Sequence, residues 1–282
     1  MVKAFYTWTR INHFDARMPN LVIANLHILL IEPSPTQQKI IVHHLQEAGV
    51  GSVHAVGSGK EVEAYLQHDR PDLLISSMYL PDCTATDLLL TLRQSEDWAA
   101  IPFMLVSSET RFRALDPIKQ AGVVAILPKP FAADDIVRAL KASLHYLEHE
   151  ELELEHFDPH ELRVLVVDDS LTARNHIRRM LNTLGIERVT LASSGKEACK
   201  QLNEQTFDLV VTDYNMPEMD GEELVRAIRS RSDGAYIPIM MVTSEQDQTL
   251  LQGVQQAGVS ALLDKPFSPD VVKQTLLNML NH

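Results

Sequence analysis

The sequence is poor in cysteine. Among its 282 residues only Cys83 and Cys199 are cysteines, one in each half of the chain. Two thiols so far apart fit a reducing cytosol better than a disulfide framework. A small fold stapled by disulfides is therefore excluded, and we expect a cytoplasmic protein.

Long apolar runs are also missing. The longest run near the start covers residues 26–31, has His27 inside it and is too short to span a bilayer. It is typical of a strand instead. No signal peptide is evident either, so we expect no insertion into a membrane.

Positive charge is scarce, because 25 Lys and Arg residues stand against 38 Asp and Glu residues and give a formal net charge of −13. This balance argues against nucleic acid as a direct partner. Much of the excess is local: residues 142–162 contain no Lys or Arg and seven acids, Glu148, Glu150, Glu151, Glu153, Glu155, Asp158 and Glu161. The pattern predicts an acidic linker over residues 151–162.

Length and periodicity predict two domains. The chain is too long for one typical domain and suits two of about 140 residues each, and its 45% hydrophobic content is enough for two cores. Residues 1–25 show no clean periodicity and are interpreted as an N-terminal tail. Five strand-and-helix units then follow in residues 26–150, and the pattern repeats in residues 163–282. Each half is therefore predicted to be α/β, a five-stranded parallel sheet with helices on both faces.

The two halves align without a gap. Corresponding positions of the two halves are 136 residues apart, for example Ser77 and Asp213. Identical runs at this offset include 58–61 with 194–197, 121–123 with 257–259, and 129–131 with 265–267. A period this long indicates two tandem copies of one globular module.

Acidic residues end two apolar runs of the second half. Asp213 follows a β-branched run and is itself followed by Pro217 and Gly221, which places it at the exposed carboxyl end of a buried parallel strand. Asp168 and Asp169 end another such run. Because three carboxylates at one sheet edge repel each other, a cation is expected to join them. Mg²⁺ suits such an all-oxygen cluster.

These residues resemble the motif of a response-regulator receiver domain of the chemotaxis-regulator kind, which belongs to two-component signal transduction. The matching positions in residues 163–282 are the pair Asp168-Asp169 after the first strand, Asp213 after the third, Thr243 after the fourth and Lys265-Pro266 after the fifth. The resemblance implies a flavodoxin-like fold. It also implies Mg²⁺-dependent transfer of a phosphoryl group to Asp213 from a sensor histidine kinase or a histidine phosphotransfer protein.

The resemblance assigns a role to each residue. Asp213 is the nucleophile and forms an aspartyl phosphate. Lys265 supplies positive charge to the phosphoryl oxygens and Thr243 donates a hydrogen bond to them. The expected Mg²⁺ ligands are the side chains of Asp168, Asp169 and Asp213 and the backbone carbonyl of Asn215.

Three positions bear on signalling. Leu262 stands where family members usually carry an aromatic residue, so an aromatic rotamer switch is not expected and repacking of Leu262 would transmit the change. Asn215 and Glu245 occupy positions that tune the access of hydrolytic water in the family. Their polar and acidic character predicts a short-lived phosphoryl group.

The first half resembles the same domain without its chemistry. Glu32 and Pro33 stand where the acid pair belongs, and Ser77 replaces the phosphoacceptor, while Ser107 and Lys129 are retained. A serine cannot accept phosphate by the carboxylate route. Residues 26–150 are therefore interpreted as a degenerate pseudo-receiver that serves as an interaction or regulatory module. Weak metal binding by Glu32 is the alternative.

The output is expected to be phosphorylation-dependent binding of a downstream protein, because no DNA-binding or catalytic module is expected after His282. A phosphorelay intermediate or phosphate sink stays open. An aspartyl-phosphate phosphatase is less favoured because it needs a second acid where Asn215 stands, and an unphosphorylated scaffold is the remaining alternative.

The linker carries an apolar stripe. Leucine and isoleucine recur at intervals near 3.5 residues, at Ile136, Leu140, Leu144, Leu147 and Leu154. The spacing predicts that the last helix of the first module runs on to about Phe157. Such a helix would fix the two modules rigidly or pair with a second chain, so a homodimer stays open.

Overall fold

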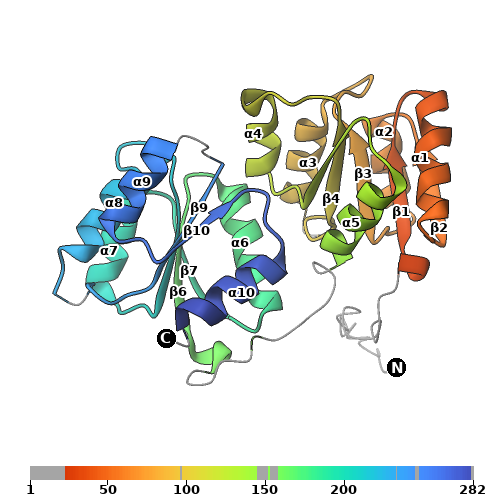
Figure 1. Cartoon of the computed structure of the whole chain (residues 1–282). Coiled ribbons are helices and arrows are strands. Elements are labelled where there is room, and N and C mark those ends of the chain that lie inside the picture. The colour runs from red at the N-terminus through yellow and green to blue at the C-terminus, as the bar shows by residue number, and fades with distance from the viewer. Residues whose placement is uncertain are drawn as a thin grey trace, which may run out of the picture.

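The computed structural model describes residues 23–95, 97–144, 152, 158–232, 234–244 and 248–280. They form two modules of the same architecture, each a five-stranded parallel sheet between two layers of helices (Figure 1). The predicted fold class is confirmed. Both sheets have the flavodoxin-like order, which is β2-β1-β3-β4-β5 in the first module and β7-β6-β8-β9-β10 in the second.

The elements alternate strictly in each module. Those of the first are β1 (His27–Ile31), α1 (Pro35–Glu47), β2 (Ser52–Val56), α2 (Gly59–Leu66), β3 (Leu73–Ser77), α3 (Ala85–Gln94), β4 (Phe103–Ser107), α4 (Phe112–Gln120), β5 (Ala125–Pro128) and α5 (Ala133–Leu144). Those of the second are β6 (Arg163–Val167), α6 (Leu171–Thr183), β7 (Arg188–Ala192), α7 (Gly195–Glu204), β8 (Leu209–Asp213), α8 (Gly221–Arg229), β9 (Ile239–Thr243), α9 (Gln248–Ala257), β10 (Ala261–Asp264) and α10 (Pro269–Leu280).

The helices begin at capping residues that the sequence repeats. Ser34 and Ser170 precede α1 and α6, and Ser58 and Ser194 precede α2 and α7. Each of these hydroxyls accepts a hydrogen bond from the backbone N–H three residues later, which satisfies a donor that the helix leaves unpaired. The same local signals therefore set the same helix starts in both modules.

Each sheet is buried on both faces. In the first module α1 and α5 cover one face, and α2, α3 and α4 cover the other. In the second module α6 and α10 cover one face, and α7, α8 and α9 cover the other. The middle strand of each sheet, β3 or β8, is accordingly apolar except at its carboxyl end, where Ser76 and Ser77 or Thr212 and Asp213 lie.

The boundaries of the modules differ in detail from those expected. Residues 23–25 form a short 3₁₀ helix, and Ile23 packs against the core of the first module. The rest of the expected tail lies outside the described residues.

Leu152 is buried but not helical, and its N–H donates to the Leu184 carbonyl at 3.0 Å. The prediction of one continuous helix to about Phe157 is therefore wrong, because Leu152 leaves helical geometry to pack on the second module. Leu147 and Leu154 lie outside the described residues.

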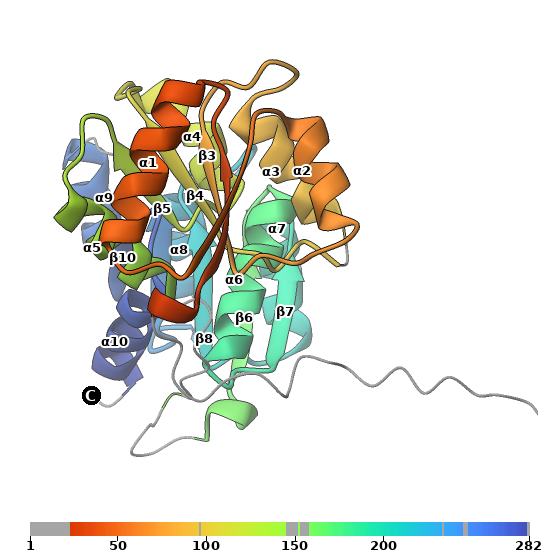
Figure 2. The same ribbon diagram turned by 90° about the vertical axis from the view of Figure 1, so that its right-hand side faces the viewer.

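The two modules meet through α3, α4 and the turn after α4 on one side and α6 on the other (Figures 1 and 2). Gly122, in this turn, has φ +83 and lies against His176 of α6, such that a Cβ on it would be 2.9 Å from the imidazole Cγ. The Gly122 carbonyl accepts a hydrogen bond from Arg93 at 3.1 Å. Glycine is required here both for its left-handed backbone and for the close approach of the other module.

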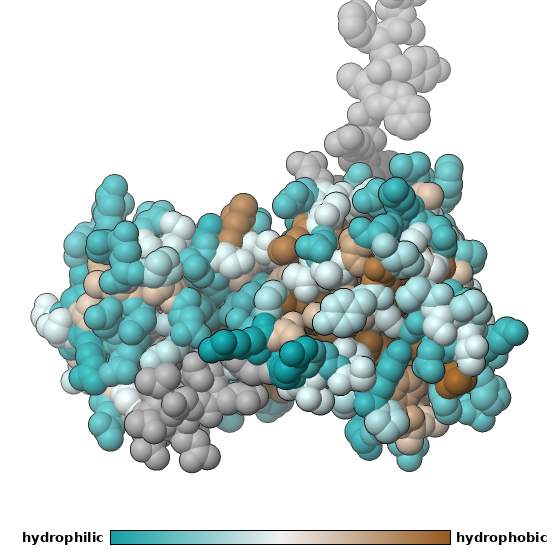
Figure 3. Space-filling model, turned by 90° about the horizontal axis from the view of Figure 1, so that it is seen from above, coloured by the Kyte–Doolittle hydropathy of each residue, from teal (hydrophilic) through white to brown (hydrophobic). Residues whose placement is uncertain are grey.

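Hydrophilic residues cover most of the face of the molecule that Figure 3 shows, and hydrophobic patches are more frequent over the first module. Within the described part of the chain, none of the helices combines the length and the apolarity that a bilayer crossing requires.

Removal of a core ring tests the packing of the first sheet. Phe103 is the largest fully buried side chain of β4, with 0% exposure. We expect Phe103→Ala to lower the free energy of unfolding of the first module by about 3–5 kcal/mol, because it leaves a cavity that the sheet cannot close. Urea unfolding followed by circular dichroism measures the loss. Ile40→Ala in α1 is the control: its side chain is 43% exposed, and a change above about 0.5 kcal/mol there would contradict this reading.

The histidine between the modules predicts a pH dependence. Burial lowers the pKa of His176 well below 6.5, and the positive charges of Arg93, Arg179 and Lys265 act in the same direction. Lys119 lines the same cavity and adds another cation. The imidazole is therefore neutral in the native protein, and it takes up a proton once separation of the modules or unfolding exposes it below pH 6.5.

The contribution of the neutral His176 imidazole to the free energy of unfolding is thus complete above that pH. It is lost as the pH falls below that value, by at most about 1.4 kcal/mol per pH unit. Urea unfolding of the wild type and of His176→Gln at about pH 7.5 and about pH 5.5 measures the effect. Because the chain has 12 histidines, the difference between the two proteins is the relevant quantity. Equal pH dependence of stability in the wild type and in His176→Gln would show that His176 is not the group responsible.

Candidate phosphoacceptor site

The predicted site residues of the second module gather at one edge of its sheet. Asp168 directly follows β6, Asp213 ends β8, Thr243 ends β9 and Lys265 directly follows β10. These strands are neighbours in the sheet, so their carboxyl ends lie side by side. None of the four residues is more than 5% exposed. The parallel topology therefore concentrates two carboxylates, an ammonium and a hydroxyl in a buried place.

Lys265 joins the two buried carboxylates. Its Nζ donates to Asp213 Oδ1 at 2.8 Å and to Asp168 Oδ2 at 3.2 Å. The other oxygen of each carboxylate accepts from a backbone N–H, Asp168 Oδ1 from Ser170 at 2.8 Å and Asp213 Oδ2 from Asn215 at 2.9 Å. All four oxygens have a donor, which is the condition for keeping charges in a dry environment.

The same contacts set the protonation of the pair. Burial raises the pKa of Asp213 to about 6; the Lys265 ammonium opposes this shift, and the Asp168 carboxylate adds to it. Burial lowers the pKa of Lys265, but the attraction of Asp213 and Asp168 is stronger, so the net shift is upward. Lys265 is therefore held protonated. One ammonium for two carboxylates leaves a negative site, which a further cation would stabilise.

A glycine shapes the turn after β8. A Cβ on Gly221 would lie 2.4 Å from the carbonyl oxygen of Asp213 and 2.9 Å from Tyr214 Cα. The Gly221 N–H donates to the Tyr214 carbonyl at 2.8 Å. Only glycine allows the start of α8 to come this close. The turn thereby holds Asp213 inward while Asn215 is exposed.

The donor set fits magnesium in its chemistry, because carboxylate and carbonyl oxygens are the ligands that Mg²⁺ prefers. Asp168 and Asp213 are buried together, whereas Asp169 is exposed. Among the described residues, no group of three His, Cys, Asp or Glu side chains has metal-binding geometry. The structure thus brings Asp168 and Asp213 together on Lys265 and does not bring Asp169 to them.

The remaining predicted residues lie around this centre. Thr243 is 0% exposed, and its carbonyl accepts from the Lys265 N–H at 2.7 Å, which ties β9 to the lysine. Leu262 in β10 is partly buried and packs on the core beneath α7, α8 and α9. Glu245 lies outside the described residues.

The corresponding place in the first module is built on a single carboxylate. Glu32 Oε2 accepts from Lys129 Nζ at 3.1 Å and from the Ser77 hydroxyl, and Glu32 Oε1 accepts from the Ser34 N–H at 3.0 Å. Burial raises the pKa of Glu32, but these hydrogen bonds outweigh it and lower the pKa overall. A cavity of about 340 Å³ adjoins them, and its lining includes Glu32, Ser77, Ser107 and Lys129. Glu32 therefore neutralises Lys129 without a second acid.

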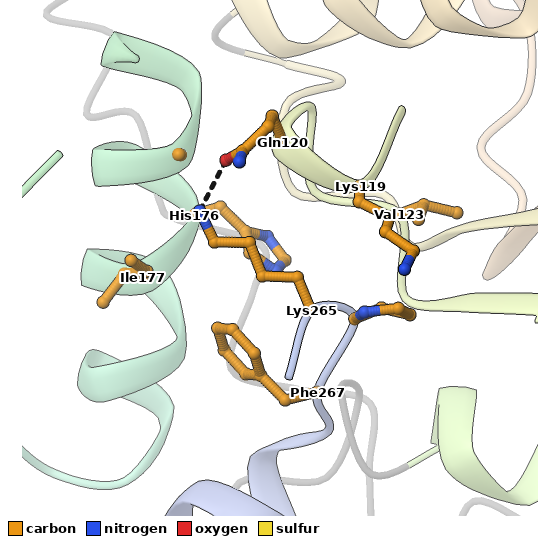
Figure 4. Close-up of a pocket in the computed structure, with 9 residues that line it drawn as sticks. Lys119, Gln120, Val123, His176, Ile177, Lys265 and Phe267 are labelled. Atoms are coloured by element: carbon orange, nitrogen blue, oxygen red, sulfur yellow. Dashed lines mark hydrogen bonds between the residues drawn. The ribbon is translucent and has the colours of Figure 1, made fainter. Parts of the chain in front are cut away.

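Sequence reasoning missed three residues that complete the second site. Lys265 Nζ also donates to Gln120 Oε1, and the hydroxyl of Ser244 donates to Asp116 Oδ1 (Figure 4 shows the first contact). Gln120 and Asp116 belong to α4 of the first module. Their spacing of four residues places them on one helix face, but nothing in the repeat indicates which surface that face meets.

Comparison with known proteins identifies the family. The model of the response regulator receiver domain matches residues 28–141 and 164–277, which is most of the chain. The chain therefore belongs to the response regulator receiver family, with two such domains in tandem, as predicted.

Two kinds of relative illustrate the likeness. The chemotaxis protein CheY1 of Helicobacter pylori strain ATCC 700392 / 26695 is 41% identical over 116 residues, which are 41% of this chain and 94% of that protein. The structure of the chemotaxis response regulator CheY4 of Vibrio cholerae is 36% identical with a TM-score of 0.40, over 42% of this chain and 98% of that chain. The receiver domain of sensor histidine kinase PA1611 of Pseudomonas aeruginosa, solved with a magnesium ion in its active site cleft, is 30% identical with a TM-score of 0.40, over 43% of this chain and 98% of that chain.

Proposed function

We propose that this two-component response regulator accepts a phosphoryl group on Asp213 of its second receiver domain and signals in the cytoplasm by binding a downstream protein. The observation that carries the proposal is the buried contact of Lys265 with Asp213 and Asp168. This contact joins two carboxylates and an ammonium at the carboxyl edge of one sheet, which supports a role of Asp213 as the nucleophile. A sensor histidine kinase or a histidine phosphotransfer protein is the phosphodonor.

The transfer needs no general base, because a carboxylate is already a nucleophile when ionised. An oxygen of Asp213 attacks the phosphorus of the donor phosphohistidine. A phosphorus–oxygen bond forms, the phosphorus–nitrogen bond breaks, and its electron pair stays on the imidazole of the donor. Lys265, which contacts Asp213 at 2.8 Å, would compensate the charge of the incoming phosphoryl oxygens.

Asp168 and Asp213, with Asp169 and the Asn215 carbonyl, are the residues that would hold Mg²⁺. When bound, the ion would screen the anionic nucleophile from the anionic donor. Asp169 is exposed and would have to turn inward to take part. The one-to-two balance of ammonium and carboxylates at this site supports the requirement for this extra cation.

Thr243 and Leu262 carry the signal in this proposal. The hydroxyl of Thr243 moves toward the new phosphoryl oxygens, and the loop after β9 moves with it. Leu262 lies in the adjacent strand and packs on the core, so repacking of an aliphatic side chain replaces an aromatic switch. Asn215 and Glu245 tune the access of water to the phosphoryl group.

The first receiver domain is a degenerate interaction or regulatory module in this proposal. Ser77 lacks the carboxylate that the transfer needs, and Glu32 is already engaged with both Ser77 and Lys129. Asn215 is a residue that cannot protonate a leaving group, which speaks against an enzyme of the phosphatase type. Catalysis is limited to self-phosphorylation and self-dephosphorylation.

Labelling with radioactive acetyl phosphate in the presence of Mg²⁺ tests the assignment of the phosphoacceptor. We expect hydroxylamine-sensitive label on the wild type and on Ser77→Ala, because the acyl phosphate forms on the second domain alone. Asp213→Asn is expected to reduce the label to background. Label that survives in Asp213→Asn, or that disappears in Ser77→Ala, would relocate the site.

Titration of the magnesium concentration tests the ligands. Removal of divalent cations with a chelator is expected to abolish labelling of the wild type. Asp168→Asn and Asp169→Asn each remove a charged ligand, so half-maximal labelling should need about tenfold more Mg²⁺. Asp264→Asn, which alters an exposed acid at the end of β10, is the control. An unchanged magnesium requirement in both ligand variants would show that these acids do not bind the ion.

A further inference from the structure

We propose that the first module is a built-in cover of the phosphoacceptor site: helix α4 docks on the second module, contacts Lys265 and the Ser244 hydroxyl next to Thr243, and must leave before Asp213 is phosphorylated. The inference rests on the proposed function of Asp213. It adds a surface, the face of α4 that carries Asp116 and Gln120, and its partner, the carboxyl edge of the second sheet.

Lys265 is the first residue of the site that α4 contacts. A lysine ammonium has three N–H donors, and Lys265 Nζ donates to three acceptors, which are Asp213, Asp168 and Gln120. A phosphoryl oxygen can therefore be bound only if one acceptor is given up. Asp168 and Asp213 belong to the site itself, whereas Gln120 comes from the other module. Its amide oxygen is thus the acceptor that docking of α4 adds to Lys265.

Ser244 is the second residue of the site that α4 contacts. It follows Thr243 directly and is 3% exposed. Its hydroxyl donates its only hydrogen to Asp116 Oδ1. Asp116 thereby adds a carboxylate at the edge where a phosphoryl group of about −1.5 to −2 charge would arrive. Repulsion between these like charges opposes docking of α4 on the phosphorylated site, so that each event excludes the other.

The first module provides an internal comparison for the covering. Its own lysine, Lys129, has a side chain that is 25% exposed beneath a cavity of about 340 Å³. The side chain of Lys265 is 4% exposed, and the cavity beside it has only about 10 Å³, which is room for roughly one water molecule. The latter cavity is lined from both modules (Figure 4). Of the two equivalent lysines, the less exposed one is thus the lysine that Gln120 of α4 contacts.

The surfaces around this contact fit each other closely. Gly122, two residues after Gln120, lies against the His176 ring, where a Cβ would be 2.9 Å from Cγ and Nδ1. Ile177 of α6 and Phe267 next to the site line the same cavity from the second module. The docked position is thus supported by packing as well as by the two polar contacts.

Docking and phosphorylation are coupled in both directions. Docking of α4 makes phosphorylation of Asp213 less favourable by a certain free energy. Because coupling between two sites is reciprocal, phosphorylation makes docking of α4 less favourable by the same amount. The released face of α4 then becomes accessible for a protein partner. The degenerate module is thus the reporter of the phosphorylation state of the second module.

The rate of labelling of the full-length chain by acetyl phosphate with Mg²⁺ tests the cover. In the double variant Asp116→Ala/Gln120→Ala the two polar contacts are lost, while all residues of the second module are intact. We expect its labelling rate to rise about tenfold above that of the wild type, which corresponds to the loss of a hydrogen bond to a charged group.

The repeat offers a matched control. Gln256 is the counterpart of Gln120 at the offset of 136 residues and is exposed on α9. Gln256→Ala should label at the wild-type rate. A wild-type rate in the double variant, with label on Asp213 in every protein, would overturn the cover and leave the proposed function intact. Absence of label from all proteins would overturn the proposed function, and with it this inference.

Hydrogen exchange supplies a readout that does not depend on phosphorylation. In the unphosphorylated double variant we expect faster amide exchange in residues 171–177 at the start of α6, because the first module no longer shields them. The β6 strand, buried in the sheet in either case, should exchange as in the wild type. Equal exchange of α6 in wild type and double variant would contradict docking through Asp116 and Gln120, and it would do so even if no phosphorylation occurred.

Discussion

The whole second site depends on keeping one ammonium between two carboxylates in a buried place. Lys265, Asp168 and Asp213 come from three strands that the parallel topology ends at one edge, and backbone N–H groups satisfy the remaining carboxylate oxygens. Breaking such an arrangement by removing one partner is costly, because the others stay buried and charged. Two carboxylates and one ammonium therefore leave an unbalanced negative charge in this buried place.

The first module shows what the same scaffold becomes when the charges change. A single glutamate takes the place of an acid pair, and its longer side chain reaches both Ser77 and Lys129. The lysine is neutralised one to one. The fold is unaffected, because the sheet order and the helix layers are those of the second module. Fold and chemistry are thus separable in this protein, since packing depends on the apolar strands and reactivity depends on a few residues at their ends.

Much of this could be predicted from the sequence. The alternation of strands and helices, the repeat at 136 residues and the place of Asp213 all follow from local periodicity and from chain breakers such as Pro217 and Gly221. The meeting of Asp168 with Asp213 and Lys265 follows from parallel strand order. What could not be predicted depends on contacts across the modules. The apolar stripe after α5 indicated a helix to Phe157, but Leu152 is buried against the second module, and tertiary packing prevailed over periodicity. Likewise, nothing in α4 shows that Asp116 and Gln120 face the other module.

The self-contained ion pair of Glu32 and Lys129 has a consequence for the chain as a whole. In the first module the lysine is balanced by one carboxylate of the same module. In the second module one lysine contacts two carboxylates. The two halves of one polypeptide therefore enclose different net charges at the same place of one fold.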